Sequence, residues 1–74
     1  MKPGDLVYVL DSHAIYARIH PKGYLVESVG IISPGELGVI IEIAHPSYFL
    51  TFARIITPKC TGWINYILIQ NIPM

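Results

Sequence analysis

Three histidines and one cysteine are the side chains of this 74-residue chain best suited to binding a metal ion. His13, His20 and His45 occur in separate turn-rich segments, and two of them directly precede a proline. Zinc motifs usually pair their ligands at spacings of two to five residues, and no pair of these residues does so. We therefore expect solvent-exposed loop histidines, with no metal site formed by them and Cys60.

Cys60 is also the only candidate for a cysteine nucleophile, and Lys59 beside it would favour the thiolate. No histidine or carboxylate is adjacent in sequence to act as its base. A general acid–base pair needs two such groups at one site, and the acidic residues are dispersed along the chain. They are Asp5, Asp11, Glu27, Glu36 and Glu42. We expect no enzyme activity, no cofactor and no small-molecule substrate.

Charge is balanced, with five basic and five acidic residues and a formal net charge of zero. Nucleic-acid-binding domains usually cluster lysine and arginine on one face, whereas the basic residues here fall in five different segments. They are Lys2, Arg18, Lys22, Arg54 and Lys59. Because the basic residues are dispersed, we do not expect this chain to bind nucleic acid or an anionic membrane.

Aromatic residues make up 11% of the chain and are the remaining candidates for a binding site. Tyrosine and tryptophan are enriched in interface hot spots because they combine a large apolar area with a polar tip. The alternative is that most of them pack the core. We expect protein contacts from Tyr16, Tyr48, Phe49, Trp63 and Tyr66.

Composition also favours a partner, since 53% of the residues are hydrophobic and only 14% are charged. A domain of this size buries a limited share of its surface, so part of the apolar content is expected outside. Self-association or a protein partner would cover it; the alternative is a core filled with isoleucine and valine. The N-terminal residues lack the apolar stretch of a signal peptide, which predicts a cytoplasmic protein or one assembled into a virion.

Regularly spaced glycines and prolines separate segments rich in valine, isoleucine and aromatic residues, which predicts short strands in a single domain over residues 1–74. The segment 36–44 alternates most clearly, and places Leu37, Val39, Ile41 and Ile43 on one face. We expect that face inside, because a one-residue slip would bury Glu42. Strands are predicted at 5–10, 23–33 with a bulge or bend at Gly30, 36–44, 48–56, 63–64 and 69–72, with a connection over 11–20 and a helical turn over 65–68.

Three stretches of the sequence resemble a known family of small β-barrels. Lys2-Pro3-Gly4-Asp5-Leu6-Val7 and Ser33-Pro34-Gly35-Glu36-Leu37-Gly38-Val39-Ile40 resemble the opening and core strand of KOW-like SH3 barrels. Gly62-Trp63-Ile64-Asn65-Tyr66-Ile67-Leu68 looks like the segment that leads such barrels into their 3₁₀ turn. The order is also similar to that in small proteins of tailed bacteriophages. The resemblance implies an all-β fold, a five-stranded SH3-like barrel with one short 3₁₀ turn near the C-terminus.

The resemblance implies a fold but little about an activity. Asp11 is the only acid in the first long loop and Trp63 the only tryptophan, unlike domains that bind proline-rich peptides. We therefore expect a non-enzymatic structural or assembly protein, such as a bacteriophage virion component, with loops 11–22 and 44–48 touching its neighbours. Two alternatives stay open: a KOW-like nucleic-acid or ribonucleoprotein module, and a small adaptor that regulates a host protein.

Overall fold

The computed structural model describes residues 1–73 and confirms an all-β chain. β-Branched and aromatic residues dominate the strands, in keeping with their preference for a pleated, half-buried surface. No helix in the described part is long and apolar enough to cross a membrane. The elements are β1 (Leu6–Val9), β2 (His13–Ile19), β3 (Leu25–Ile32), β4 (Leu37–Ser47), β5 (Leu50–Ile56), β6 (Thr61–Asn65), η1 (Tyr66–Leu68) and β7 (Ile69–Asn71).

The expectation of a five-stranded closed barrel is wrong. The strands form one seven-stranded antiparallel open sheet in the order β3-β2-β6-β5-β4-β1-β7, so β3 and β7 are its edges. β2 lies in the segment 11–20 that was expected to be a connection. The segment has a mixed polar composition, and only Ile15 in it is fully buried, so the sequence shows no clear strand pattern there. Its pairing with β3 and β6 stabilises it as a strand.

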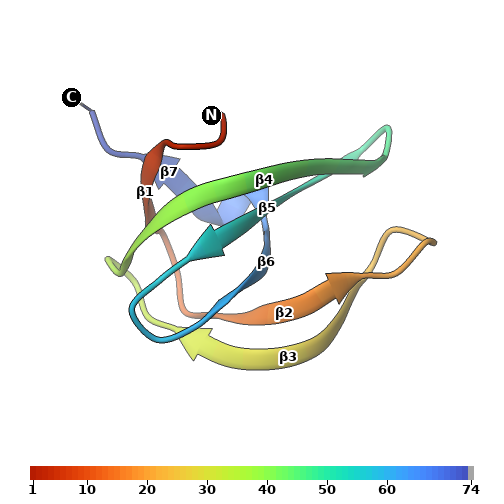
Figure 1. Ribbon diagram of the computed structural model, residues 1–74, viewed down its shortest axis with the longest axis horizontal. Coiled ribbons are helices and arrows are strands. Elements are labelled where there is room, and N and C mark those ends of the chain that lie inside the picture. The colour runs from red at the N-terminus through yellow and green to blue at the C-terminus, as the bar shows by residue number, and fades with distance from the viewer. Residues whose placement is uncertain (74) are drawn as a thin grey trace.

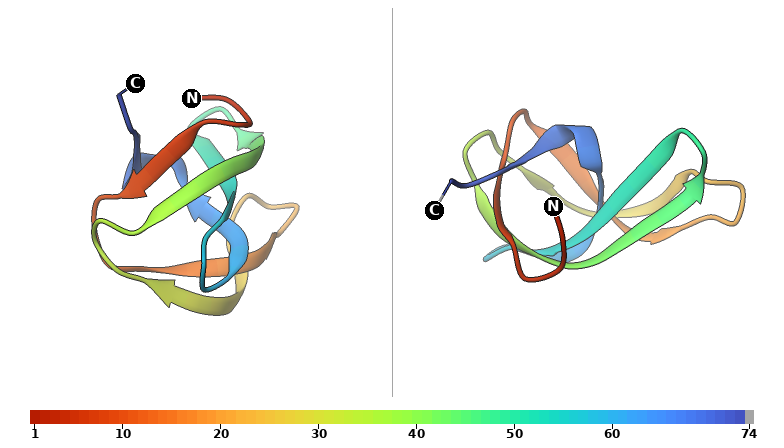
Figure 2. Two further views of the ribbon diagram at one scale, coloured as in Figure 1. Left: turned by 60° about the vertical axis from the view of Figure 1, so that its left-hand side comes forward. Right: turned by 90° about the horizontal axis from the view of Figure 1, so that it is seen from above.

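The open sheet is strongly curved, so that one core lies within it (Figures 1 and 2). Every strand contributes at least one buried side chain to that core, and isoleucine predominates. The hairpins β2–β3 and β4–β5 extend beyond the core on the same side of the molecule (Figure 1). The core residues are Val7, Val9, Ile15, Ile32, Ile40, Ala53, Ile55, Ile64 and Ile69.

The predicted inner face of β4 is wrong at its first two positions. Leu37 and Val39 are 50% and 38% exposed, whereas Ile40 is completely buried. A β-bulge explains both observations: Ile40 pairs with Ile55 and Glu42 with Arg54, which leaves Ile41 as an extra residue on β4. The bulge reverses the alternation, so Ile40 points inward while Glu42 still faces solvent.

Two local predictions are confirmed. The register of β3 against β2 shifts beside Gly30, because Ile15 pairs with Gly30 but Tyr16 with Ser28. The 3₁₀ turn forms at Tyr66–Leu68, where the Asn65 side chain accepts a hydrogen bond from the Ile67 amide at 3.2 Å. That cap ends β6 and redirects the chain toward β7, beside β1.

Candidate interaction surface

The five predicted contact residues fall into three separate places. Tyr16 and Trp63 lie directly opposite each other on β2 and β6, and both are half-buried. Tyr48 and Phe49 form the tip of the β4–β5 hairpin, 101% and 94% exposed. Tyr66 lies in η1 and is half-buried. The structure therefore brings together two pairs, not one five-residue cluster.

Tyr16 and Trp63 belong to a row of side chains that crosses four strands. Trp63 pairs with Arg54 on β5, and Arg54 pairs with Glu42 on β4. Directly paired residues share a sheet face, so this row lies on the face opposite the core. The Arg54 guanidinium and the Glu42 carboxylate are 3.8 Å apart and about half exposed. A surface ion pair of this kind contributes about 0–1 kcal/mol.

The hairpin tip projects its two aromatic rings into solvent. The ring centroids of Tyr48 and Phe49 are 6.3 Å apart with an angle of 51° between the rings. The Phe49 amide donates a weak hydrogen bond to the Ser47 hydroxyl at 3.4 Å, within the turn. Phe49 is thus exposed, whereas Phe52 on β5 is only 3% exposed and packs inside.

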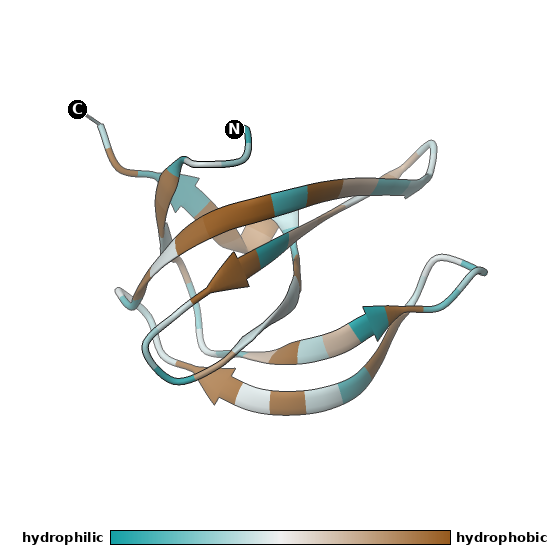
Figure 3. Ribbon diagram, viewed as in Figure 1, coloured by the Kyte–Doolittle hydropathy of each residue, from teal (hydrophilic) through white to brown (hydrophobic). Residues whose placement is uncertain are grey.

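Sequence reasoning missed an apolar surface at the other end of the β4–β5 hairpin. Leu6 pairs with Val39 and Val39 with Ile56, so three strands place these residues side by side on the outer face. Leu6 is 37% exposed and Ile56 47%. With Leu37 they surround an open hollow of about 310 Å³. Figure 3 shows these parts of β4 and β5 as hydrophobic bands. The hollow is lined by Leu6, Leu37, Gly38, Val39, Ile56, Thr57 and Pro58.

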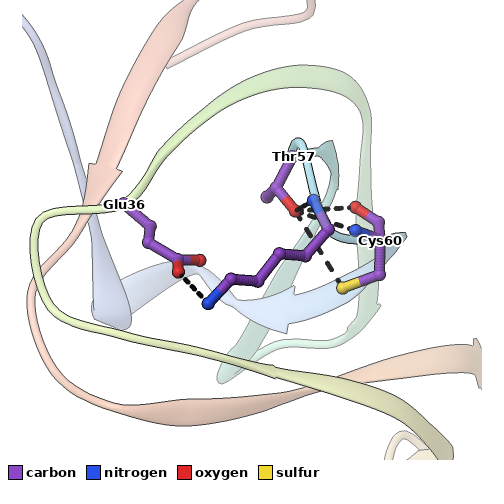
Figure 4. A network of polar contacts seen from close by, with 4 residues as sticks. Glu36, Thr57 and Cys60 are labelled. Carbon is purple, nitrogen blue, oxygen red and sulfur yellow. Dashed lines mark hydrogen bonds and ion pairs between the residues drawn. The ribbon is translucent and has the colours of Figure 1, made fainter.

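A hydrogen-bonded turn fixes one wall of this hollow (Figure 4). The buried Thr57 hydroxyl donates to the Cys60 carbonyl at 2.9 Å and accepts from the amides of Cys60 and Lys59 at 3.1 and 3.3 Å. Lys59 in turn pairs with the Glu36 carboxylate, directly before Leu37. The turn thus holds Pro58 and ties the end of β5 to the start of β4.

Gly38 is the sequence signal that could have revealed the hollow. A Cβ added at Gly38, between Leu37 and Val39, would lie on the inner face of the sheet, 3.1 Å from the Ile56 carbonyl oxygen. A glycine inside a strand often marks such a close backbone approach. Assigning Gly38 to the inner face would have placed Leu37 and Val39 outside.

The histidines and the cysteine remain apart. His20 stacks on Tyr24 with ring centroids 4.3 Å apart, and His45 hydrogen-bonds with Thr51 at 3.1 Å. The expectation of exposed loop histidines is wrong for His13, which is half-buried in β2, and His45 is exposed but lies in β4. Cys60 is half-buried in the turn before β6. Within residues 1–73, no group of three or more histidine, cysteine or acidic side chains could hold a metal ion.

Three of the five basic residues are neutralised locally. Arg18 pairs with Glu27 at 2.7 Å, in addition to the pairs made by Arg54 and Lys59. These pairs lie on different parts of the surface and do not form a basic stripe.

The chain matches no family model, no curated protein and no solved structure.

Proposed function

We propose that this chain is a non-enzymatic assembly protein that acts through the outer face of its sheet. The observation that supports this most directly is the uncharged hollow surrounded by Leu6, Leu37, Val39 and Ile56. The resemblance to small proteins of tailed bacteriophages suggests a virion as the setting for that assembly.

Exposure of these four side chains is unusual because they adjoin one another. Single exposed apolar residues are normal on a protein surface, but contiguous apolar patches mark interaction sites. The seven residues that line the hollow carry no charge, so covering them would leave no unpaired ion buried. A partner with an apolar projection therefore fits this surface better than a charged ligand does.

Charge arrangement favours protein contacts over the nucleic-acid alternative. Arg18, Arg54 and Lys59 already have carboxylate partners. Binding to a phosphate backbone would have to compete with these pairs, and it would need basic groups that track one groove. The Tyr16–Trp63 pair would offer a stacking platform without that groove.

The proposal can be tested by immobilising the chain and identifying the proteins that it captures. Leu37→Glu is the hollow variant, because it places a charge in the hollow. Leu10→Glu is the matched control, because Leu10 is 47% exposed and Leu37 50%, but Leu10 does not line the hollow. We expect the wild-type chain and the control to retain the same protein partner, and the hollow variant to lose it. Identical profiles for all three chains would contradict the proposal.

A further inference from the structure

We propose that the occupant of the hollow is the Tyr48–Phe49 tip of a second copy of this chain, in a two-fold dimer with two such contacts. This inference rests on the proposed function, since it names the partner of the same surface. In the dimer, the β4–β5 hairpins of two copies would lie antiparallel, and each tip would fill the hollow of the other copy.

The tip and the hollow match in chemistry. The turn from Pro46 to Leu50 carries no charged residue, and its two aromatic rings are almost fully exposed. The hollow is equally uncharged, and its volume of about 310 Å³ lies at the lower end of the range for binding pockets. Docking the tip there, with one ring in the hollow and the other against its rim, would remove apolar surface from water on both sides without placing a charge in the hollow.

A chain cannot fill its own hollow with its own tip. The hollow lies at the base of the β4–β5 hairpin, where Val39 pairs with Ile56, and Tyr48 and Phe49 lie at the opposite end (Figure 1). Strands rise about 3.3 Å per residue, so the eight steps from Val39 to Ser47 place the tip roughly 25 Å away. The ring must therefore come from another molecule.

The buried area indicates that a stable dimer needs two tip–hollow contacts. Each large aromatic side chain buries at most about 150–250 Å², so the two rings of one tip cover at most roughly 300–500 Å², with at most a similar area of the receptor. One contact therefore buries at most about 600–1,000 Å² in total, below the 1,200–2,000 Å² of a standard interface. Two contacts related by a two-fold axis reach that range, and two-fold dimers are the commonest oligomers.

The first test measures the mass of the wild-type chain and two variants by sedimentation across concentration. We expect the wild-type chain to approach twice its 8.3 kDa mass. Phe49→Asp and Leu37→Glu should each weaken the dimer at least about 30-fold, as loss of an interface hot spot does. Ile67→Asp and Leu10→Glu are the controls, because both replace exposed apolar residues elsewhere and should dimerise like wild type.

The second test mixes the two variants. Phe49→Asp keeps an intact hollow and Leu37→Glu keeps an intact tip, so a mixture can form one contact although neither variant alone can form any. With ¹⁵N-labelled Phe49→Asp, unlabelled Leu37→Glu should shift the amide signals of Leu6, Val39 and Ile56. With the labels exchanged, the shifts should appear at residues 47–50. A chain carrying both substitutions is the control that should shift nothing.

The outcomes separate this inference from the proposed function. A wild-type chain that stays monomeric, or a mixture without shifts, would overturn the dimer. Masses that continue to rise past the dimer would overturn the two-fold arrangement. If Leu37→Glu alone abolishes partner capture and Phe49→Asp has no effect on it or on mass, the outer face binds a different partner. The proposed function would then stand without the dimer.

Discussion

Leu6 on β1 lies directly opposite Val39 on β4, and more than a third of each side chain is exposed on the outer face of the sheet. Two apolar side chains at a cross-strand pair normally stabilise a sheet by packing together and against a covering layer. Here the pair forms the floor of an open hollow. The outer face of β1, β4 and β5 therefore presents apolar side chains that no other part of the described chain covers.

Replacing Val39 by threonine should separate assembly from folding. Threonine keeps the β-branched shape but places a hydroxyl in the hollow, so we expect weaker self-association with a free energy of unfolding changed by less than about 1 kcal/mol. Sedimentation and urea unfolding of the same sample measure the two quantities. A large loss of stability with unchanged mass would mean that Val39 belongs to the core.

The β4 bulge can be tested by alanine substitutions on either side of it. Ile40→Ala should lower the free energy of unfolding by about 2–5 kcal/mol, because it removes a fully buried side chain. Leu37→Ala should lower it by less than about 1 kcal/mol, since half of that side chain is exposed. Denaturant unfolding of both variants gives the comparison. A larger loss of stability for Leu37→Ala than for Ile40→Ala would mean that Leu37 faces the core, as simple alternation along the strand predicts.

Gly62 should tolerate no side chain. A Cβ there would lie 2.5 Å from both Ile15 Cγ2 and the Tyr16 carbonyl oxygen, where β6 crosses β2. We expect Gly62→Ala to cost about 1–3 kcal/mol or more, because backbone atoms would have to move. Gly4→Ala is a useful comparison, since it meets no neighbour and costs only the strain of its positive φ. A midpoint in urea for Gly62→Ala equal to that of the wild-type chain would contradict the close approach at Gly62.

The Thr57 hydroxyl should stabilise the turn that holds Pro58 against the hollow. Thr57→Val keeps the side-chain shape but leaves the Cys60 and Lys59 amides without their acceptor. These hydrogen bonds are partly buried, and a typical intramolecular hydrogen bond contributes about 0.5–1.5 kcal/mol net, so we expect a loss of about that size in urea unfolding. Thr57→Ser retains the hydroxyl and should recover most of it, whereas equal losses for both variants would point to the methyl group instead.

The sequence was sufficient for several features that depend on local chemistry. The apolar segments between turns were expected as strands; β1, β3 and β5 form within them, and β4 overlaps its expected segment. Gly30 marked its bulge, and the cap at Asn65 forms the turn expected there. Of the expected contact residues, Tyr48 is fully exposed beside its turn, whereas Tyr16 is half-buried within β2. In each case a few neighbouring residues decide the outcome.

Features that depend on distant strands were not predictable in the same way. β2 has mixed polarity and becomes a strand because β3 and β6 pair with it. The extra residue Ile41 has no local signature, yet it reverses which residues of β4 face the core. The hollow follows from that reversal, so it was missed together with the bulge. An open seven-stranded sheet instead of a closed barrel is likewise decided by pairings between distant segments.

Sedimentation equilibrium of the wild-type chain beside Leu37→Glu and Leu10→Glu, at low and high salt, tests most sharply whether the outer face mediates self-association. We expect a concentration-dependent dimer that persists in high salt for the wild-type chain and Leu10→Glu, because apolar contacts are not screened by ions. We expect an 8.3 kDa monomer for Leu37→Glu. Equal masses for all three chains at every concentration would contradict an assembly role for the outer face in self-association.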